Sequence, residues 1–96
     1  MNNLYFQDKY EAIYLYDNDI FIGSISYSIA NDLLYISDFI IEEQYRRKGY
    51  GTKLVEYLLD NINTDLEYVV HCNDQSINIF KKLGFNEKEK YTILTK

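Results

Sequence analysis

The sequence contains no proline and no tryptophan, and it has only one cysteine, Cys72, and one histidine, His71. A single cysteine excludes a disulfide within these 96 residues, and one histidine beside it excludes a Cys/His metal cluster. Long apolar runs are also missing, because Asp, Glu, Lys or Asn interrupts each of them. We therefore expect no metal, no signal peptide and no membrane span, and a cytoplasmic location.

Positive charge is scarce as well. Ten Lys and Arg residues stand against fifteen Asp and Glu, for a formal net charge of −5. Nucleic-acid binding needs an extended basic surface, so this balance argues against nucleic acid as the main partner. It fits a cationic substrate better. The content of hydrophobic residues, 47%, suits one small soluble domain over residues 1–96.

The first half of the chain alternates between apolar and polar residues with a period of two, which predicts strands. We expect three of them, over Glu11–Tyr16, Ile20–Ile29 and Leu33–Glu42. The polar stretches DND (17–19) and AND (30–32) between them are typical turns. The three strands should therefore form an antiparallel meander.

After Gly51 the period changes to that of a helix, which we expect over residues 51–62. An apolar strand, Leu66–Cys72, and a second helix, Asp74–Leu83, should follow, and Gly84 suits a left-handed helix end. Strand, helix and strand make a βαβ unit with parallel strands. Residues 91–95 leave room for one or two short closing strands. The predicted fold is α+β: a mixed sheet with a helix on each face.

The stretch QYRRKGYGTKLVEYLL, residues 44–59, concentrates basic residues before two glycines and a helix. Its pattern is R-x-x-G-x-G. Free amides at a helix start and nearby basic side chains favour a phosphate, so the local interpretation is a pyrophosphate cradle. The glycine spacing fits neither a Walker loop nor a Rossmann fingerprint. Taken alone, the pattern is equally compatible with an ordinary strand-to-helix turn that carries solvated basic residues.

A second segment favours the pyrophosphate cradle over an ordinary turn. NDQSINIFKKLGF, residues 73–85, together with IIEEQYRRKGYGTKLVEYLL, resembles the two signature segments of the GNAT superfamily of acetyl-CoA-dependent N-acetyltransferases. The first segment matches the strand, the glycine loop and the helix of that family. The second matches an asparagine at a strand end, followed by a helix that closes in L-G-F. The resemblance covers about residues 35–85 and implies a GNAT-like fold.

The resemblance also implies how coenzyme A would bind. The loop residues Arg46, Arg47, Lys48, Gly49, Tyr50, Gly51 and Thr52 would hold the pyrophosphate, mostly through main-chain amides. The strand around Phe39, Ile40 and Ile41 would pair with the pantetheine arm, which requires the two parallel strands to splay apart. A main-chain N–H at Phe39 or Ile41 would face the thioester carbonyl. Asn73 would contact the pantetheine arm, and Phe80 and Lys82 would line the cofactor.

Family members typically let an amine attack the thioester directly, so a base must remove a proton from the amine. Asp38, near the expected thioester, is one candidate, but it also suits a solvent-facing strand. His71 is another, since histidine titrates near neutral pH, although it equally suits a histidine packed on the sheet. Glu42 or Glu43 would act through water. The tyrosine that often serves as acid in the family falls at Phe80, which cannot donate a proton.

The chain departs from the family in a second respect. Family members usually place two helices between their first strands, and the turns at 17–19 and 30–32 leave no room for them. The acceptor side should therefore be open, or completed by a second subunit in a homodimer. An open site suits a protein lysine, a terminal amine or a polyamine-like acceptor. The alternative function is a coenzyme A-binding module with little or no catalysis, acting as a sensor or interaction partner.

Overall fold

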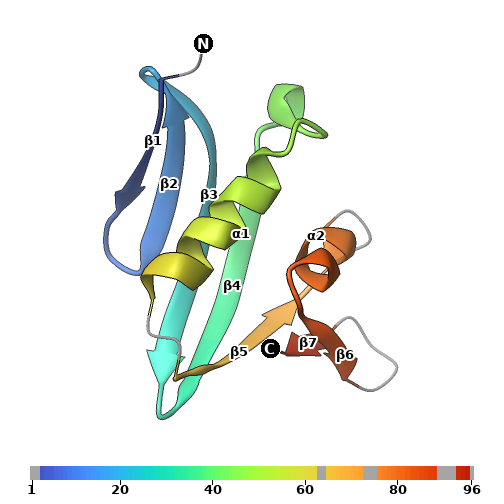
Figure 1. Cartoon of the computed structure of the whole chain (residues 1–96). Helices are drawn as coiled ribbons and strands as arrows, with labels where there is room; N and C mark the ends of the chain where they lie inside the picture. The colour runs from blue at the N-terminus through green and yellow to red at the C-terminus, as the bar shows by residue number, and fades with distance from the viewer. Residues whose placement is uncertain (1–2, 63–64, 73–75, 89–92, 96) are drawn as a thin grey trace.

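The structure is a computed structural model that describes residues 3–62, 65–72, 76–88 and 93–95. These residues form one mixed sheet of seven strands in the order β1-β2-β3-β4-β5-β7-β6 (Figure 1). The strands are β1 (Leu4–Asp8), β2 (Ala12–Asp17), β3 (Ile20–Ala30), β4 (Leu33–Ile41), β5 (Glu67–His71), β6 (Asn86–Lys88) and β7 (Ile93–Thr95). The helices are η1 (Glu43–Tyr45), α1 (Tyr50–Asn61) and α2 (Ile77–Lys82).

The antiparallel meander is confirmed, and it has one strand more than the sequence predicts. Strands β2, β3 and β4 lie within one or two residues of the expected ranges and pair as consecutive hairpins. The additional strand, β1, pairs antiparallel with β2 from Leu4↔Asp17 to Asp8↔Ile13. Only residues 9–11 connect β1 to β2. The predicted turns are confirmed, since only residues 18–19 join β2 to β3 and only residues 31–32 join β3 to β4, and the unpredicted connection at 9–11 is also short.

The βαβ unit is also confirmed. Strands β4 and β5 run parallel, and α1 forms the crossover between them. The α1 helix buries Leu54, Val55 and Leu58, which is the stripe that the sequence period predicts. These side chains pack on Ile13, Leu15, Ile22 and Ile25 of the meander in one hydrophobic core.

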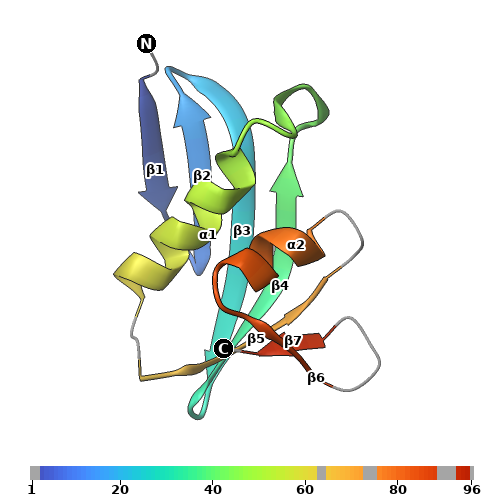
Figure 2. The ribbon, with the colours of Figure 1, turned by 45° about the vertical axis from the view of Figure 1, so that its right-hand side comes forward.

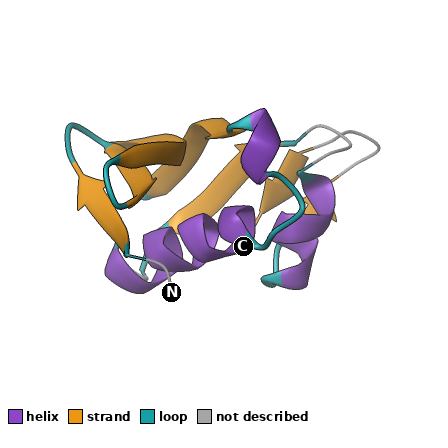
Figure 3. Ribbon diagram, turned by 90° about the horizontal axis from the view of Figure 1, so that it is seen from above, coloured by secondary structure: helices purple, strands orange, loops and turns teal. Residues whose placement is uncertain are grey.

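The prediction of a helix on each face of the sheet is wrong for the helices that the structure describes. Both α1 and α2 lie on the same face, as Figures 2 and 3 show from two directions. The physical reason is that α2 completes the core beneath α1: Phe80 is fully buried in the same hydrophobic cluster as Leu54 and Val55. The opposite face of the sheet, which we call the helix-free face, carries no described α-helix.

The end of α2 follows the sequence prediction closely. Gly84 has a left-handed backbone, with φ of 101°. The Phe85 N–H donates to the Phe80 carbonyl and the Gly84 N–H to the Lys81 carbonyl, which together form a Schellman motif. The Phe80 and Phe85 rings contact each other across this turn, with centroids 5.2 Å apart. The motif thus ends the helix and places both rings in the core.

Candidate active site

The central feature of the site is a separation of the two parallel strands. Strand β4 pairs with β5 only over its first four residues, from Leu33↔Glu67 to Ile36↔Val70. From Ser37 to Ile41, β4 continues beside β3 without pairing to β5. We call this opening, between residues 37–41 of β4 and the end of β5, the slot. It is the splay that the family resemblance implies.

A β-bulge begins the slot. Ser26 of β3 pairs with Asp38 and Tyr27 pairs with Ile36, so Ser37 is an extra residue on β4. Before the bulge the even-numbered residues, Leu34 and Ile36, are buried on the helix side. After it, Phe39 and Ile41 pack against the core instead. Asp38 and Ile40 consequently lie on the helix-free face, where both are exposed.

The backbone of β4 presents polar groups to the slot at alternate residues. The Glu42 N–H donates to the Ile22 carbonyl of β3. The Ile40 carbonyl lies against Gly23, which is also in β3. Since successive residues of a strand direct their N–H and C=O groups to opposite sides, those of Phe39 and Ile41 point away from β3 and toward the slot. That one of these N–H groups faces the thioester carbonyl of the cofactor stays a prediction.

The loop between η1 and α1 places the first helical amides at the same end of the slot. Arg47 and Gly49 both have positive φ, 63° and 87°, which turns the chain into the helix. No side chain caps α1, and its first backbone hydrogen bond runs from the Lys53 N–H to the Gly49 carbonyl. The amides of Tyr50, Gly51 and Thr52 precede that bond and therefore have no partner within the helix.

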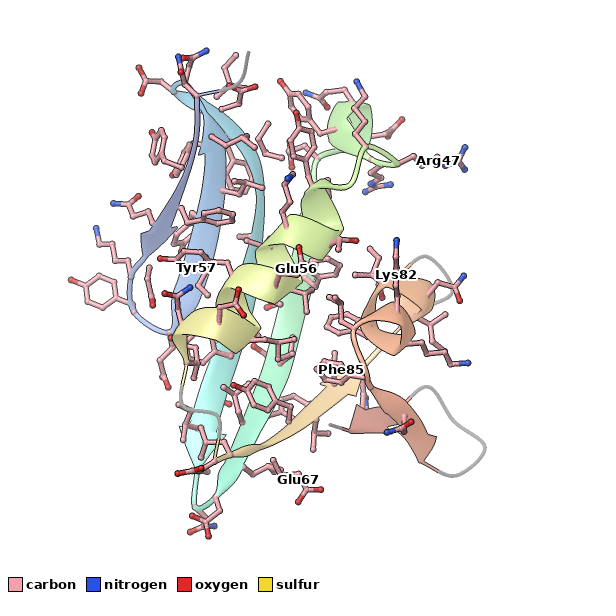
Figure 4. The ribbon with its side chains drawn as sticks, in the orientation of Figure 1. Arg47, Glu56, Tyr57, Glu67, Lys82 and Phe85 are labelled. Atoms are coloured by element: carbon pink, nitrogen blue, oxygen red, sulfur yellow. The ribbon has the colours of Figure 1, made fainter. Side chains whose placement is uncertain are left out.

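The three basic side chains of the loop differ in their surroundings, although all are exposed. Arg46 donates from Nε to the Ile41 carbonyl oxygen at 2.9 Å, so it fixes the end of β4 beside the slot. Arg47 extends away from the molecule (Figure 4). Tyr50, in the same loop, packs edge-on against Tyr45, with ring centroids 6.0 Å apart. The sequence predicts Arg46 only as a residue at the rim of the site, and its hydrogen bond to the Ile41 carbonyl was not predicted.

The predicted cofactor contacts on the far side of the slot have different outcomes. Phe80 is 0% exposed, and its ring is packed against those of Phe39 and Phe85. It is a core residue, so the structure does not support its predicted role in lining the cofactor. Lys82 is exposed and extends from α2 in the direction of the glycine loop (Figure 4). Asn73 lies outside the described residues.

Two of the predicted candidates for a base, Asp38 and His71, lie on the helix-free face. Asp38 follows the bulge on β4, and His71 ends β5. The His71 ring contacts Tyr35 edge-on, with centroids 6.0 Å apart, at the point where β4 and β5 separate. No hydrogen bond between Asp38 and His71 is present in the described part of the chain. Cys72 is buried, and burial raises the pKa of its thiol, although a hydrogen bond with Ser76 opposes this shift.

Within the described ranges, no group of three or more His, Cys, Asp or Glu side chains could hold a metal ion. No helix in the same ranges has the length and apolar character needed to cross a membrane. The site is therefore built from backbone groups of a strand and a helix start, with charged side chains at its rim. Such a site suits an elongated anionic ligand.

Two parallel strands splay apart beside an uncapped helix start. This arrangement is typical of the GNAT fold, which the sequence resembles. The sequence profile of the acetyltransferase (GNAT) family matches residues 2–85. The chain belongs to this family.

Individual relatives agree with this assignment. The N-acetyltransferase 9-like protein of Schizosaccharomyces pombe is 42% identical over 59 residues, which cover 50% of this chain and 27% of that protein. Among solved structures, a Bacillus subtilis N-acetyltransferase in complex with coenzyme A has a TM-score of 0.71 at 15% identity, covering 90% of this chain and 66% of that one. The ribosomal-protein-S18-alanine N-acetyltransferase of Escherichia coli has a TM-score of 0.72 at 18% identity, covering 93% and 66%. The chain is thus similar in fold to proteins longer than itself.

Proposed function

We propose that this protein transfers an acetyl group from acetyl-CoA to a primary amine, by direct attack in a ternary complex. The observation that carries the proposal is the slot between β4 and β5, which opens beside the uncapped start of α1. A long anionic thioester needs both features together: amides for its phosphates and a strand edge for its amide-containing arm.

In this proposal the pyrophosphate of coenzyme A binds the amides of Tyr50, Gly51 and Thr52. Arg46, Arg47 and Lys48 supply positive charge at the rim. Gly49 leaves open space there, since nothing lies within 4 Å of the position where a side chain would begin. The pantetheine arm then runs along residues 39–41 as an added strand, with Lys82 and Asn73 as further contacts.

The chemistry requires one bond to form and one to break. The amine nitrogen attacks the thioester carbonyl carbon, the carbon–sulfur bond breaks, and the thiolate leaves. Negative charge develops on the carbonyl oxygen, and a backbone N–H of Phe39 or Ile41 is directed into the slot to stabilise it. Losing a preorganised donor of this kind typically raises a barrier by about 3–4 kcal/mol. The ammonium must also release a proton before it attacks.

Asp38 and His71 are the proposed bases for that proton. Both are exposed on the helix-free face, close in the fold to where β4 and β5 separate. An acidic side chain there also attracts a cationic amine, in agreement with the net charge of −5. Because only residues 9–11 join β1 to β2, this face has no helical cover from that connection, which favours a bulky acceptor such as a terminal amine or a protein lysine.

The test combines calorimetry with a thiol-release assay. Acetyl-CoA and coenzyme A are titrated into the protein, and free thiol is then measured with a lysine peptide, a peptide with a free N-terminus and spermidine. We expect turnover with at least one amine, and a loss of about 10²-fold or more in Asp38→Asn or His71→Gln. Glu67→Gln is the matched control, because Glu67 lies at the paired end of β5 and points away from the slot (Figure 4).

A binding module without catalysis is the second candidate, and the observation that favours it is Phe80. This position carries no hydroxyl and is fully buried, so it supplies no acid for the leaving thiolate. Tight binding of acetyl-CoA with no thiol release above the uncatalysed rate, on all three amines, would support the module and contradict the transferase. If neither acetyl-CoA nor coenzyme A binds, both the transferase and the binding module are contradicted.

A further inference from the structure

A groove lies on the opposite side of the meander from the slot, between strand β1 and helix α1. We call it the β1–α1 groove, and its lining residues are Leu4, Phe6, Lys53, Glu56, Tyr57 and Asp60. Its floor is apolar, with Phe6 stacked on Tyr57 at 4.3 Å between ring centroids. At about 260 Å³ it lies below the usual range of small-molecule pockets, roughly 300–1,000 Å³.

Strand β1 forms one edge of the sheet, and this edge has little protection against pairing. Its sequence is LYFQD, and its five residues pair with β2 without a bulge. The opposite edge strand, β6, has only three residues and the sequence NEK. Proteins usually protect their edges with short strands, charge, proline or bulges, and β1 has none of these apart from its final Asp8.

The free hydrogen-bonding groups of β1 are identified by the turn that follows it. The Lys9 N–H donates to the Ala12 carbonyl and the Ala12 N–H donates back to Lys9, so these two residues form a hydrogen-bonded pair. Such pairs alternate along an antiparallel ladder. Tyr5 and Gln7 therefore bond to β2, whereas Leu4, Phe6 and Asp8 direct their N–H and C=O groups to the open edge.

Two of the three charged residues of α1 that line the groove, Lys53 and Asp60, lie on either side of the same point, and the third, Glu56, lies beside it. Lys53 lies four residues before Tyr57 and Asp60 lies three after it, so all three share the helix face that turns to β1. Figure 4 shows Tyr57 extending from α1 toward β1. Phe6 is the middle residue of β1 and stacks on Tyr57. The centre of the strand and the centre between the two opposite charges thus coincide.

We propose that the β1–α1 groove is a homodimer interface in which β1 pairs antiparallel with β1 of a second copy. A two-fold axis at Phe6 brings Phe6 of one copy opposite Phe6 of the other, with their outward N–H and C=O groups bonded. The same axis places Lys53 of each copy opposite Asp60 of the other, which is the self-complementarity that a two-fold interface requires. The interface is separated from the slot by β2 and β3 and does not depend on the proposed acetyl transfer.

Hydrogen exchange tests the strand pairing without any mutation. Amide exchange is measured by NMR or mass spectrometry across a concentration series, with the mass followed by light scattering. We expect the Leu4, Phe6 and Asp8 amides to become at least tenfold slower as the dimer forms, while Tyr5 and Gln7 stay slow throughout. A monomer at every concentration up to millimolar, or a dimer in which the three outward amides keep their rates, would overturn the proposal.

A charge exchange tests the helix contacts independently. Lys53→Glu and Asp60→Lys each replace two attractive pairs in the dimer by two repulsive ones, and each should raise the dissociation constant of the dimer by about fivefold or more. The double variant Lys53→Glu/Asp60→Lys restores opposite charges across the axis and should return close to the original value. If the double variant dissociates as readily as the single variants, the two residues do not meet across a two-fold axis.

Discussion

Gly51 and Phe39 approach each other so closely that a side chain at residue 51 has no free space. A Cβ atom on Gly51 would lie 3.0 Å from Cζ of Phe39 and 2.9 Å from Cδ1 of Ile79. Its backbone is that of an ordinary helix, so packing and not conformation requires glycine here. The contact holds the start of α1 against the slot half of β4. Gly49, two residues earlier, has the opposite requirement: a left-handed backbone and open space.

The first prediction concerns Gly51→Ala. In an open helix, alanine in place of glycine would stabilise by up to about 1 kcal/mol. Here the new methyl meets Phe39 and Ile79, and we expect a net loss of about 1 kcal/mol in the free energy of unfolding, measured in urea. Adding Ile79→Val removes the Cδ1 atom and should recover part of that loss. A Gly51→Ala protein more stable than the parent would contradict the packing role.

The second prediction concerns Gly49, whose φ of 87° is unfavourable for residues with a side chain. Gly49→Ala should lower the free energy of unfolding by about 1–2 kcal/mol, or else shift the loop and weaken coenzyme A binding by a comparable free energy. Gly49→Asn is the matched variant, since asparagine tolerates this conformation better. Urea unfolding and calorimetry on both variants distinguish the cases. Equal effects of alanine and asparagine would mean that conformation is not the cause.

The third prediction concerns the turn between β1 and β2. Tyr10 and Glu11 have φ of 54° and 59°, which defines a two-residue turn of type I′. Asparagine and glycine are preferred at these positions, and Tyr10 is 89% exposed, so little packing is lost on replacing it. Tyr10→Asn/Glu11→Gly should raise the free energy of unfolding by about 1 kcal/mol. Thermal unfolding measures it, and Glu11→Gly alone shows how much the glycine contributes.

The fourth prediction concerns alkaline pH. Burial raises the pKa of the Tyr27 phenol, and the carboxylates of Asp8 and Glu11 raise it further; burial also raises the pKa of Tyr68. The folded protein therefore holds these protons more tightly than the unfolded chain, whose tyrosines titrate near pH 10. The stability that this provides is complete below about pH 10 and is lost as the pH rises through the folded values.

Unfolding in urea at pH 7, 9, 10 and 11 measures this loss. Tyr68→Phe removes one of the two groups and should make the decline above pH 10 less steep. Tyr10→Phe, at an exposed tyrosine, is the control and should leave the decline unchanged. A decline of equal steepness in Tyr68→Phe and in the control would show that the buried phenol does not cause it.

The sequence was informative about the fold wherever periodicity was long. The alternation in residues 20–29 and the helical stripe of Leu54, Val55 and Leu58 predicted a meander and a crossover that the structure contains. Strand β1 was not predicted, because LYFQD has only five residues and too few of them are buried to give a clear alternation; three are exposed. The common face of α1 and α2 was also missed, since it depends on Phe80 joining a core built mostly from distant residues.

The site was predictable to a similar extent. The glycine loop could be identified from spacing and charge, and the slot from the family resemblance. The bulge at Ser37 left no clear signal in the sequence: the buried or half-buried apolar positions 34, 36, 39 and 41 show a step of three, but Leu33 and Ile40 are apolar too and hide it. The bond from Arg46 to the Ile41 carbonyl left none, because it depends on the path of the loop in space.

The order of the strands has a consequence for how the molecule is assembled. Each strand from β1 to β4 pairs with its neighbour in the chain through a connection of two or three residues, whereas β4 and β5 are separated by the whole of η1 and α1. Contacts between residues close in sequence form faster than distant ones. We therefore expect the meander to fold first and the pairing of β4 with β5 to form last. The slot would then form at the boundary between an early and a late folding unit.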